Sequence, residues 1–309
     1  MHLGFLTDGL GHRPFVEVLG IVADLGLSEI ELTTGNWSRS PHVDLELLLA
    51  DGARREKLSW ELADHGLHIG ALNASGNPLH PITGSQHDAV TRDTIRLAGL
   101  LDVHKIVMMS GLPAVYEGDR TAPWITTCWP PENVTNRQRQ WEAAVEYWRN
   151  LVAFAHDHGV DRIAVEMHAD QLVYNAPTLL RLREAVGGVV GANMDPSHLM
   201  WMGADPVASV KLLGDAVYHV HAKDARIEAA AAVRTHLETL PFEERGERAW
   251  NYVTLGEGHP GGVEFWQRFC RALQQGGYDG VLSIEHEDVA YTAEEGLRRS
   301  AALLGGVLG

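Results

Sequence analysis

Residues 163–195 read IAVEMHADQLVYNAPTLLRLREAVGGVVGANMD and contain one complete strand–helix–strand unit. The run 163–165 is short, apolar and rich in β-branched residues, which predicts a strand. A helical pattern of leucines follows at 179–182, and a second apolar run covers 189–194. Neither run alternates between apolar and polar residues. Near-continuous apolar strands are typical of a parallel sheet that is covered on both faces.

The same unit recurs along the whole chain. Eight apolar runs, each followed by an amphipathic stretch, lie at residues 3–6, 29–32, 68–72, 105–109, 163–165, 189–194, 217–220 and 281–284. Eight β/α units in a chain of 309 residues favour a (β/α)8 TIM barrel over a doubly wound sheet. No Gly-x-Gly-x-x-Gly follows the first run, which weakens a dinucleotide-binding interpretation. Because the sequence contains no linker or low-complexity tract, we predict one α/β domain, residues 1–309.

A residue that can bind a metal stands at the end of four of these runs. These residues, called the quartet below, are Glu166, Asp195, His221 and Glu285. A carboxylate or imidazole at a strand tip adds nothing to core packing, and the carboxyl ends of the strands carry the active site of a TIM barrel. Three carboxylates and one imidazole suit a hard divalent cation. The quartet therefore predicts a metal centre.

Two long segments interrupt the repeat, after the fourth and seventh predicted strands. Residues 111–140 form a predicted loop that contains Trp124 and Trp129. Long loops in compact domains are usually lids or binding loops, and aromatic rings stack on sugars and on other rings. The second segment, residues 227–262, is predicted to be mobile or to form an interface.

Composition limits the classes of partner. The net charge of −16 argues against nucleic acid and anionic membranes, which require clustered lysine and arginine. No apolar run reaches the roughly 18–20 residues that span a bilayer, and no signal peptide is expected. The two cysteines, Cys128 and Cys270, lie far apart, so we expect free thiols and a reducing, cytoplasmic location.

Four short motifs contain the quartet: VEMH (165–168), NMDPSH (193–198), HVHAKD (219–224) and SIEHED (283–288). Together they resemble the xylose isomerase-like barrel superfamily of sugar isomerases, ketose 3-epimerases, inosose dehydratases and AP endonucleases. The resemblance spans essentially the whole chain. It implies that the quartet binds one divalent metal and that His198 contacts substrate. It also implies a basic residue that binds a substrate oxygen. Arg226 lies one position from the epimerase spacing.

The predicted chemistry follows from the ligands. A metal held in this way acidifies a C–H bond beside a carbonyl, and a nearby base removes the proton to give an enediolate. The resemblance implies that Glu166 and Glu285 act on opposite faces of the carbon. His168 is a further candidate base, because strand side chains two residues apart share a face. Lys223 is expected to pair with Asp224 and shape the pocket.

Two outcomes remain open for the enediolate. The motifs resemble those of catalytic α subunits of bacterial C-glycoside deglycosidases, which cleave 3-oxo C-glycosides of aromatic aglycones and pair with a small β subunit. Such a lyase expels a leaving group by β-elimination, whereas an isomerase or ketose 3-epimerase reprotonates the carbon of a free sugar or sugar acid. The aromatic loop and the acidic composition slightly favour the lyase acting on a neutral glycoside.

Other classes fit less well. Related DNA-repair nucleases need additional histidines, and the fourth apolar run ends Met108-Met109-Ser110 without one. A binding module without activity would leave the quartet unexplained. Oxygen-rich ligation favours Mn2+, with Mg2+, Co2+ and Zn2+ as alternatives. We expect either a small β subunit or a second copy of the chain as protein partner.

Overall fold

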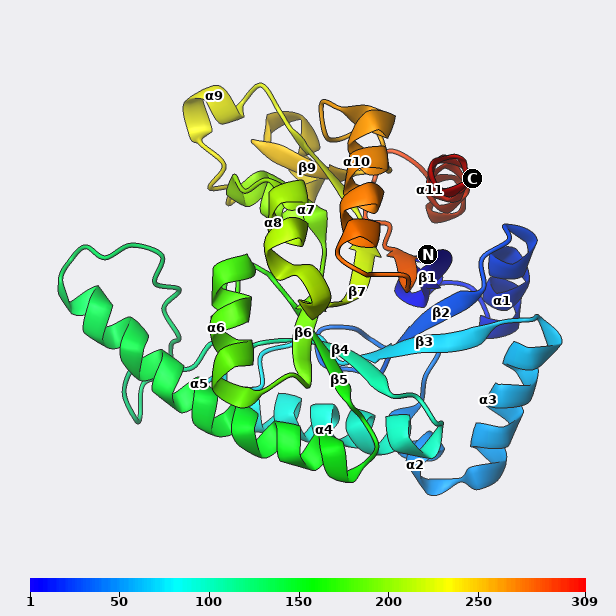
Figure 1. Ribbon diagram of the computed structural model, residues 1–309, viewed down its shortest axis with the longest axis horizontal. Helices are drawn as coiled ribbons and strands as arrows, with labels where there is room; N and C mark the ends of the chain where they lie inside the picture. The colour runs from blue at the N-terminus through cyan, green and yellow to red at the C-terminus, as the bar shows by residue number, and fades with distance from the viewer.

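The computed structural model describes residues 1–309 and contains a closed barrel of eight parallel strands. These strands are β1 (His2–Leu6), β2 (Glu29–Thr33), β3 (His68–Asn73), β4 (Lys105–Met109), β5 (Arg162–Glu166), β6 (Val190–Asn193), β7 (Val217–Ala222) and β10 (Val281–Ile284). β1 pairs with both β2 and β10, so the barrel has no free edge. The predicted (β/α)8 barrel is confirmed (Figure 1), and the eight strands of the closed barrel correspond to the eight predicted strands.

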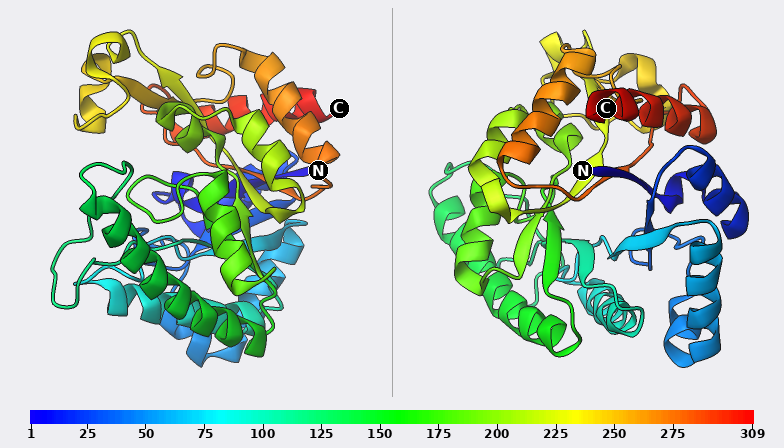
Figure 2. Two further views of the ribbon diagram at one scale, coloured as in Figure 1. Left: turned by 60° about the vertical axis from the view of Figure 1, so that its left-hand side comes forward. Right: turned by 45° about the vertical axis from the view of Figure 1, so that its right-hand side comes forward.

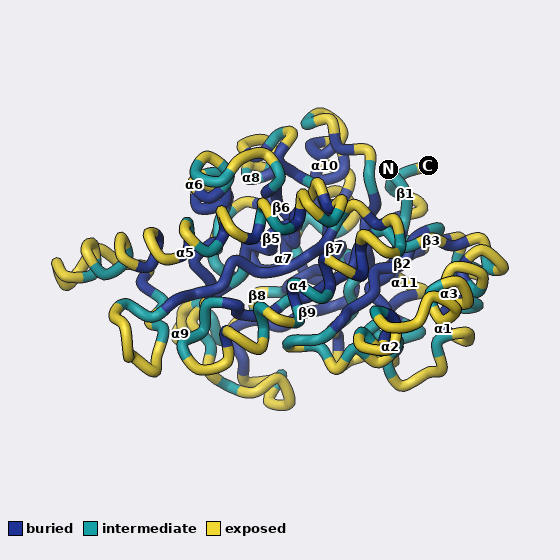
Figure 3. Tube along the Cα trace, turned by 90° about the horizontal axis from the view of Figure 1, so that it is seen from below, coloured by how far each residue is buried: buried dark blue, intermediate teal, exposed yellow.

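Helices surround the barrel (Figure 2). They are α1 (Phe15–Asp24), α2 (Leu45–Ala50), α3 (Gly52–Asp64), α4 (Gly84–Leu100), α5 (Glu132–Asp157), α6 (Ala176–Val186), α7 (Pro196–Met202), α8 (Pro206–Leu213), α10 (Gly262–Gln275) and α11 (Ala293–Leu308). Figure 3 shows the strands buried in the middle and the outer faces of the helices exposed. None of the helices is long and apolar enough to cross a membrane.

The loop after β4 is shorter than predicted, because α5 already begins at Glu132 and not after residue 140. Proline directly before a helix and an acidic residue in its first turn both favour a helix start, and here Pro131 precedes Glu132. The first turns of α5 are polar and exposed (Figure 3), which explains why their composition suggested a loop. Further along, the buried Trp148 Nε1 donates a hydrogen bond to the Ser110 carbonyl, 2.9 Å away, and so fixes α5 to the end of β4.

The segment after β7 contains regular structure. β8 (Asp224–Ile227) and β9 (Trp250–Val253) form an antiparallel ribbon, with the short helix α9 (Ala231–Arg234) in the connection between them. The Asp224 carboxylate accepts hydrogen bonds from the backbone N–H groups of Gly256 and His259 and from the indole of Trp266. Asp224 therefore anchors the chain after the ribbon. The prediction that Lys223 forms an ion pair with Asp224 is therefore wrong.

Both cysteines are free thiols, as expected. Cys128 is exposed, and Cys270 is buried in α10. Burial raises the pKa of the Cys270 thiol to about 12, so this group is an inert part of the core.

Candidate metal centre

The carboxyl ends of β5, β6, β7 and β10 bring the quartet together. Ligand atoms of Glu166, Asp195 and His221 all lie within 4.8 Å of one another. The Nδ1 atom of His221 is 3.1 Å from Glu166 Oε2 and 2.9 Å from Glu285 Oε2. All four side chains are buried except for a small exposed part of Glu285. Strands that are far apart in the sequence thus deliver four metal-binding groups to one point.

The sequence of α7 explains how Asp195 and His198 are oriented. Asp195 is the N-cap of α7, and its Oδ1 accepts hydrogen bonds from the backbone N–H and the hydroxyl of Ser197. Pro196 occupies the first helical position, which proline favours. One turn of helix then places His198 Nε2 at 3.3 Å from Asp195 Oδ2 and 3.0 Å from Glu166 Oε1. The free oxygen of Asp195 therefore faces the other ligands.

The polar atoms at this point fit a divalent cation. Asp195 Oδ2 and Glu285 Oε2 are buried yet accept no hydrogen bond of good geometry, although buried polar atoms normally do. The ammonium of Lys223 lies 2.9 Å from Glu285 Oε1 and 3.3 Å from Asp195 Oδ2, and it compensates one of the three carboxylate charges. The negative charge that remains favours a divalent cation, which would bind Asp195 Oδ2 and Glu285 Oε2 directly.

Glu31 was not predicted from the sequence, although it contacts the metal-binding imidazole. This fully buried carboxylate on β2 lies 3.0 Å from His221 Nε2 and 2.8 Å from His219 Nε2. It also accepts hydrogen bonds from Asn73 and Ser283. An acceptor at Nε2 fixes the tautomer in which Nδ1 is free to bind a metal. The only sequence signal was a glutamate that stands between two apolar residues, Ile30 and Leu32, inside a predicted strand.

The pKa values describe how the site compensates its charge without a metal. Burial opposes protonation of His221, but Glu31, Glu285 and Glu166 surround it and raise its pKa well above the ordinary value. Although burial favours the neutral acid, hydrogen bonds and charges from histidines hold the pKa values of Glu31 and Glu166 well below the usual range. The imidazolium of His221 is therefore the proton-bearing group that a metal would replace.

The side chains of His168 and Glu166 lie on the same side of the chain, as the alternation of strand side chains predicted. Ligand atoms of Glu166, His168 and His198 lie within 4.8 Å of one another, and the rings of His168 and His198 are 4.2 Å apart. Burial, and next the electrostatic influence of the neighbouring His198, lower the pKa of His168 to about 4. His168 is thus neutral at pH 7 and able to accept a proton.

The basic candidates occupy different places. Lys223 is buried, and its ammonium lies over the ring of Tyr252, 4.6 Å from the centroid. The Tyr252 hydroxyl in turn lies 3.1 Å from His198 Nδ1. Arg226 sits on β8, where its guanidinium pairs with Glu228 at 2.8 Å.

The two candidate tryptophans are also separated. Trp124 meets Tyr174 edge to face, with ring centroids 5.5 Å apart. Together with Leu199, next to His198 in the sequence, and Trp201, they line a small cavity. Trp129 is 72% exposed and does not line that cavity. Trp124 is therefore the better placed of the two to contact a ligand beside α7.

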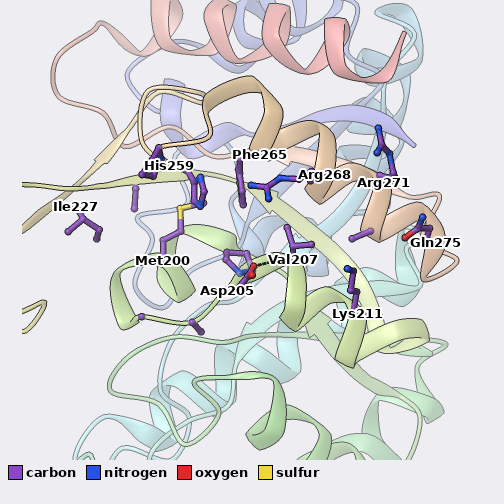
Figure 4. A pocket seen from close by; sticks show the side chains of 16 residues that line it. Met200, Asp205, Val207, Lys211, Ile227, His259, Phe265, Arg268, Arg271 and Gln275 are labelled. Carbon is purple, nitrogen blue, oxygen red and sulfur yellow. Dashed lines mark hydrogen bonds between the residues drawn. The ribbon is translucent and has the colours of Figure 1, made fainter.

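A larger groove lies on the outside of the barrel, between α8 and α10 (Figure 4). Lys211 of α8 and Arg268 and Arg271 of α10 line it, and Asp205 caps the start of α8. None of the quartet is among its lining residues. The candidate metal centre is therefore at the barrel end and not in this groove.

Replacing Glu31 with glutamine should weaken metal binding by about 10- to 100-fold, because the amide no longer fixes His221 in the binding tautomer. Calorimetric titration with Mn2+ measures this. The matched control is Ser283→Ala, which removes one donor to Glu31 and leaves the carboxylate in place. Equal affinities for the Glu31→Gln variant and the wild type would show that Glu31 does not orient His221.

Metal binding should release about one proton at pH 7, because the metal displaces the proton of His221. Below the pKa of His221, affinity should therefore fall about tenfold for each pH unit. Calorimetry in phosphate and in Tris, whose ionisation enthalpies differ, counts the released protons. A binding enthalpy that is the same in both buffers would contradict the proton exchange.

Comparison with known proteins identifies relatives of this chain. It is 45% identical over 309 residues, 98% of both chains, to the uncharacterized protein YfiH of Bacillus subtilis (strain 168). It is 28% identical over 151 residues to an inosose dehydratase of Clostridium botulinum (strain Alaska E43 / Type E3), 48% of both chains. It is also 30% identical over 181 residues to the rhizopine catabolism protein MocC of Rhizobium meliloti, 55% of this chain and 52% of that protein. The chain thus spans about half the length of these two relatives.

Solved structures share the fold. The IolI protein with a bound zinc atom superposes with a TM-score of 0.69 at 20% identity, over 100% of this chain and 98% of that one. A D-psicose 3-epimerase of Clostridium cellulolyticum H10 gives a TM-score of 0.66 at 16% identity, over 100% and 98%. The family model described as "Xylose isomerase-like TIM barrel" matches residues 19–305. The chain therefore belongs to the xylose isomerase-like TIM barrel family.

Proposed function

We propose that the chain is a divalent-metal-dependent carbohydrate enzyme that removes a proton beside the carbonyl of a keto-sugar. The observation that carries this proposal is the convergence of the quartet: ligand atoms of Glu166, Asp195 and His221 lie within 4.8 Å of one another, and Glu285 Oε2 lies 2.9 Å from His221 Nδ1. When bound there, the metal supplies Lewis acidity that polarises the carbonyl. Mn2+ is the proposed metal because three of the four ligands are carboxylates, and Mg2+, Co2+ or Zn2+ are alternatives.

The surrounding side chains have distinct proposed roles. Glu166, Glu285 and neutral His168 are the candidate bases that take the proton from carbon. His198 lies between His168 and the carboxylates, where it can donate a hydrogen bond to a substrate oxygen. Lys223 stays protonated, because Glu285, Glu287 and Asp195 outweigh the effect of burial and raise its pKa well above the ordinary value. Its charge can stabilise the negative charge that develops on oxygen.

The asymmetry of the site supports the lyase as the first candidate. A neutral base, His168, lies beside Glu166, and a permanent cation, Lys223, pairs with Glu285. Elimination uses such a division, because one group takes the proton and the cation stabilises the departing oxygen or carbon group. Two matched proteins are dehydratases by name, an inosose dehydratase and a probable 3-DHS dehydratase. The Trp124 cavity offers an aromatic wall for an aglycone.

The alternative is an isomerase or ketose 3-epimerase that acts on a free sugar or sugar acid. It is favoured by one feature, since Glu166 and Glu285 both approach Nδ1 of His221 and so can flank one substrate carbon. For the lyase, we also propose a small β subunit as partner, and for either enzyme a homo-oligomer is possible. Neither candidate requires nucleic acid or a membrane.

One assay separates the two outcomes. The protein with Mn2+ is incubated with a 3-oxo C-glycoside, with an inosose and with free ketoses, each with and without a candidate β subunit. Aglycone release or loss of water without ketose interconversion supports the lyase. Ketose interconversion without elimination would instead establish the isomerase. Neither activity under any of these conditions would contradict the proposed function.

Glu285→Gln should lower the rate of whichever reaction is found by roughly 100-fold or more, because it removes a metal ligand and a candidate base. Glu287→Gln is the matched control. Glu287 also pairs with Lys223, at 3.1 Å, but it is half exposed, and such pairs contribute little, so the rate should stay within about fivefold of wild type. Full activity of the Glu285→Gln variant would refute the role assigned to the quartet.

A further inference from the structure

A second group of metal-binding side chains lies at the opposite end of the barrel, where the strands begin. His2 of β1, Glu29 of β2 and His68 of β3 have ligand atoms within 4.8 Å of one another. The Nε2 atoms of both histidines approach the same oxygen, Glu29 Oε1, in hydrogen-bonding contact for His2 and at 3.0 Å for His68. Three adjacent strands thus aim two imidazoles at one buried carboxylate.

The neighbouring residues leave room for this carboxylate. Gly70 follows His68 by two residues, and a Cβ atom there would lie 2.0 Å from Glu29 Oε2. Gly4 pairs with Glu29 in the sheet, and a Cβ atom there would lie 3.0 Å from the Glu29 carbonyl oxygen. Any larger residue at position 70 would displace the Glu29 carboxylate from the two histidines. The absence of side chains at Gly4 and Gly70 therefore makes the space that Glu29 occupies.

The separation between His68 and Glu29 is close to that between two ligands of one metal. In a tetrahedral zinc site with bonds of about 2.0–2.1 Å, neighbouring ligand atoms are roughly 3.3 Å apart. The separation between His68 Nε2 and Glu29 Oε1 is 3.0 Å, so only a small outward movement is needed. We propose that His2, Glu29 and His68 form a second metal site, selective for zinc-like cations, at the amino-terminal end of the barrel.

The charges and the exposure agree with this assignment. The Glu29 carboxylate carries the only negative charge within the three-residue group, and both imidazoles can bind as neutral ligands. The side chains of His2 and His68 are 41% and 61% exposed, so an ion can enter and water can complete its coordination. The positive charge of Lys105 acts on Glu29 from the barrel interior. Its ammonium points to the Tyr218 carbonyl, 3.5 Å away.

The two sites should differ in the metal they prefer. The quartet offers three carboxylates and one imidazole, which suits Mn2+ or Mg2+ as well as zinc. The group at the other end offers two imidazoles and one carboxylate, a set that suits zinc, nickel or cobalt and not the harder cations. A metal there would also link the first residues of β1, β2 and β3, so it should stabilise the fold.

Calorimetric titration of the metal-free chain, without an added histidine tag, tests the second site. Wild type should bind two Zn2+ but one Mn2+ per chain. His68→Gln should weaken one of the two zinc sites by at least about tenfold and leave Mn2+ binding unchanged. The control is His104→Gln, because His104 is also 61% exposed and precedes β4 at the same end of the barrel, and it should retain both zinc sites.

Thermal unfolding gives a second measure. Zinc added to the chain already saturated with Mn2+ should raise the melting temperature of wild type and of His104→Gln, and not that of His68→Gln. The unchanged Mn2+ affinity shows that each variant is folded. A single Zn2+ per wild-type chain, or two undiminished sites in His68→Gln, would overturn the proposal. Neither outcome depends on which reaction the quartet supports.

Discussion

Buried negative charge around one imidazole is the constraint on which the site depends. Glu31, Glu166 and Glu285 all approach His221 to about 3 Å, and Asp195 lies beside them. Carboxylates removed from water at such distances repel one another strongly unless a cation compensates them. Lys223 and a proton on His221 compensate part of that charge. A divalent cation would compensate it more completely, because it can bind several carboxylate oxygens at once.

The barrel makes this concentration of charge possible. Parallel strands deliver their carboxyl ends to one rim, and the hydrogen-bonded strands around it hold each ligand at a fixed depth. The same geometry gathers the starting ends of β1, β2 and β3, where His2, Glu29 and His68 meet. Hard ligands at one end and nitrogen-rich ligands at the other would let a single barrel hold two different metals.

Features local to one strand or one turn could be predicted from the sequence. The barrel follows from the eight apolar runs, and the positions of the quartet follow from strand tips. Contacts inside the barrel, away from the strand tips, were not predictable. Glu31 reaches His221 across the barrel, and the irregular register between Ile30 and Glu31 places it at a depth that no local pattern encodes. The start of α5 was missed because its first turns are exposed and polar, like a loop.

The most direct test of the central claim is a crystal structure of the Mn2+-loaded chain, measured for anomalous scattering. We predict the strongest peak at about 2.2 Å from carboxylate oxygens of Glu166, Asp195 and Glu285 and from Nδ1 of His221, with Glu31 still bound to Nε2. No peak among these residues, or coordination through Nε2 of His221, would contradict the account.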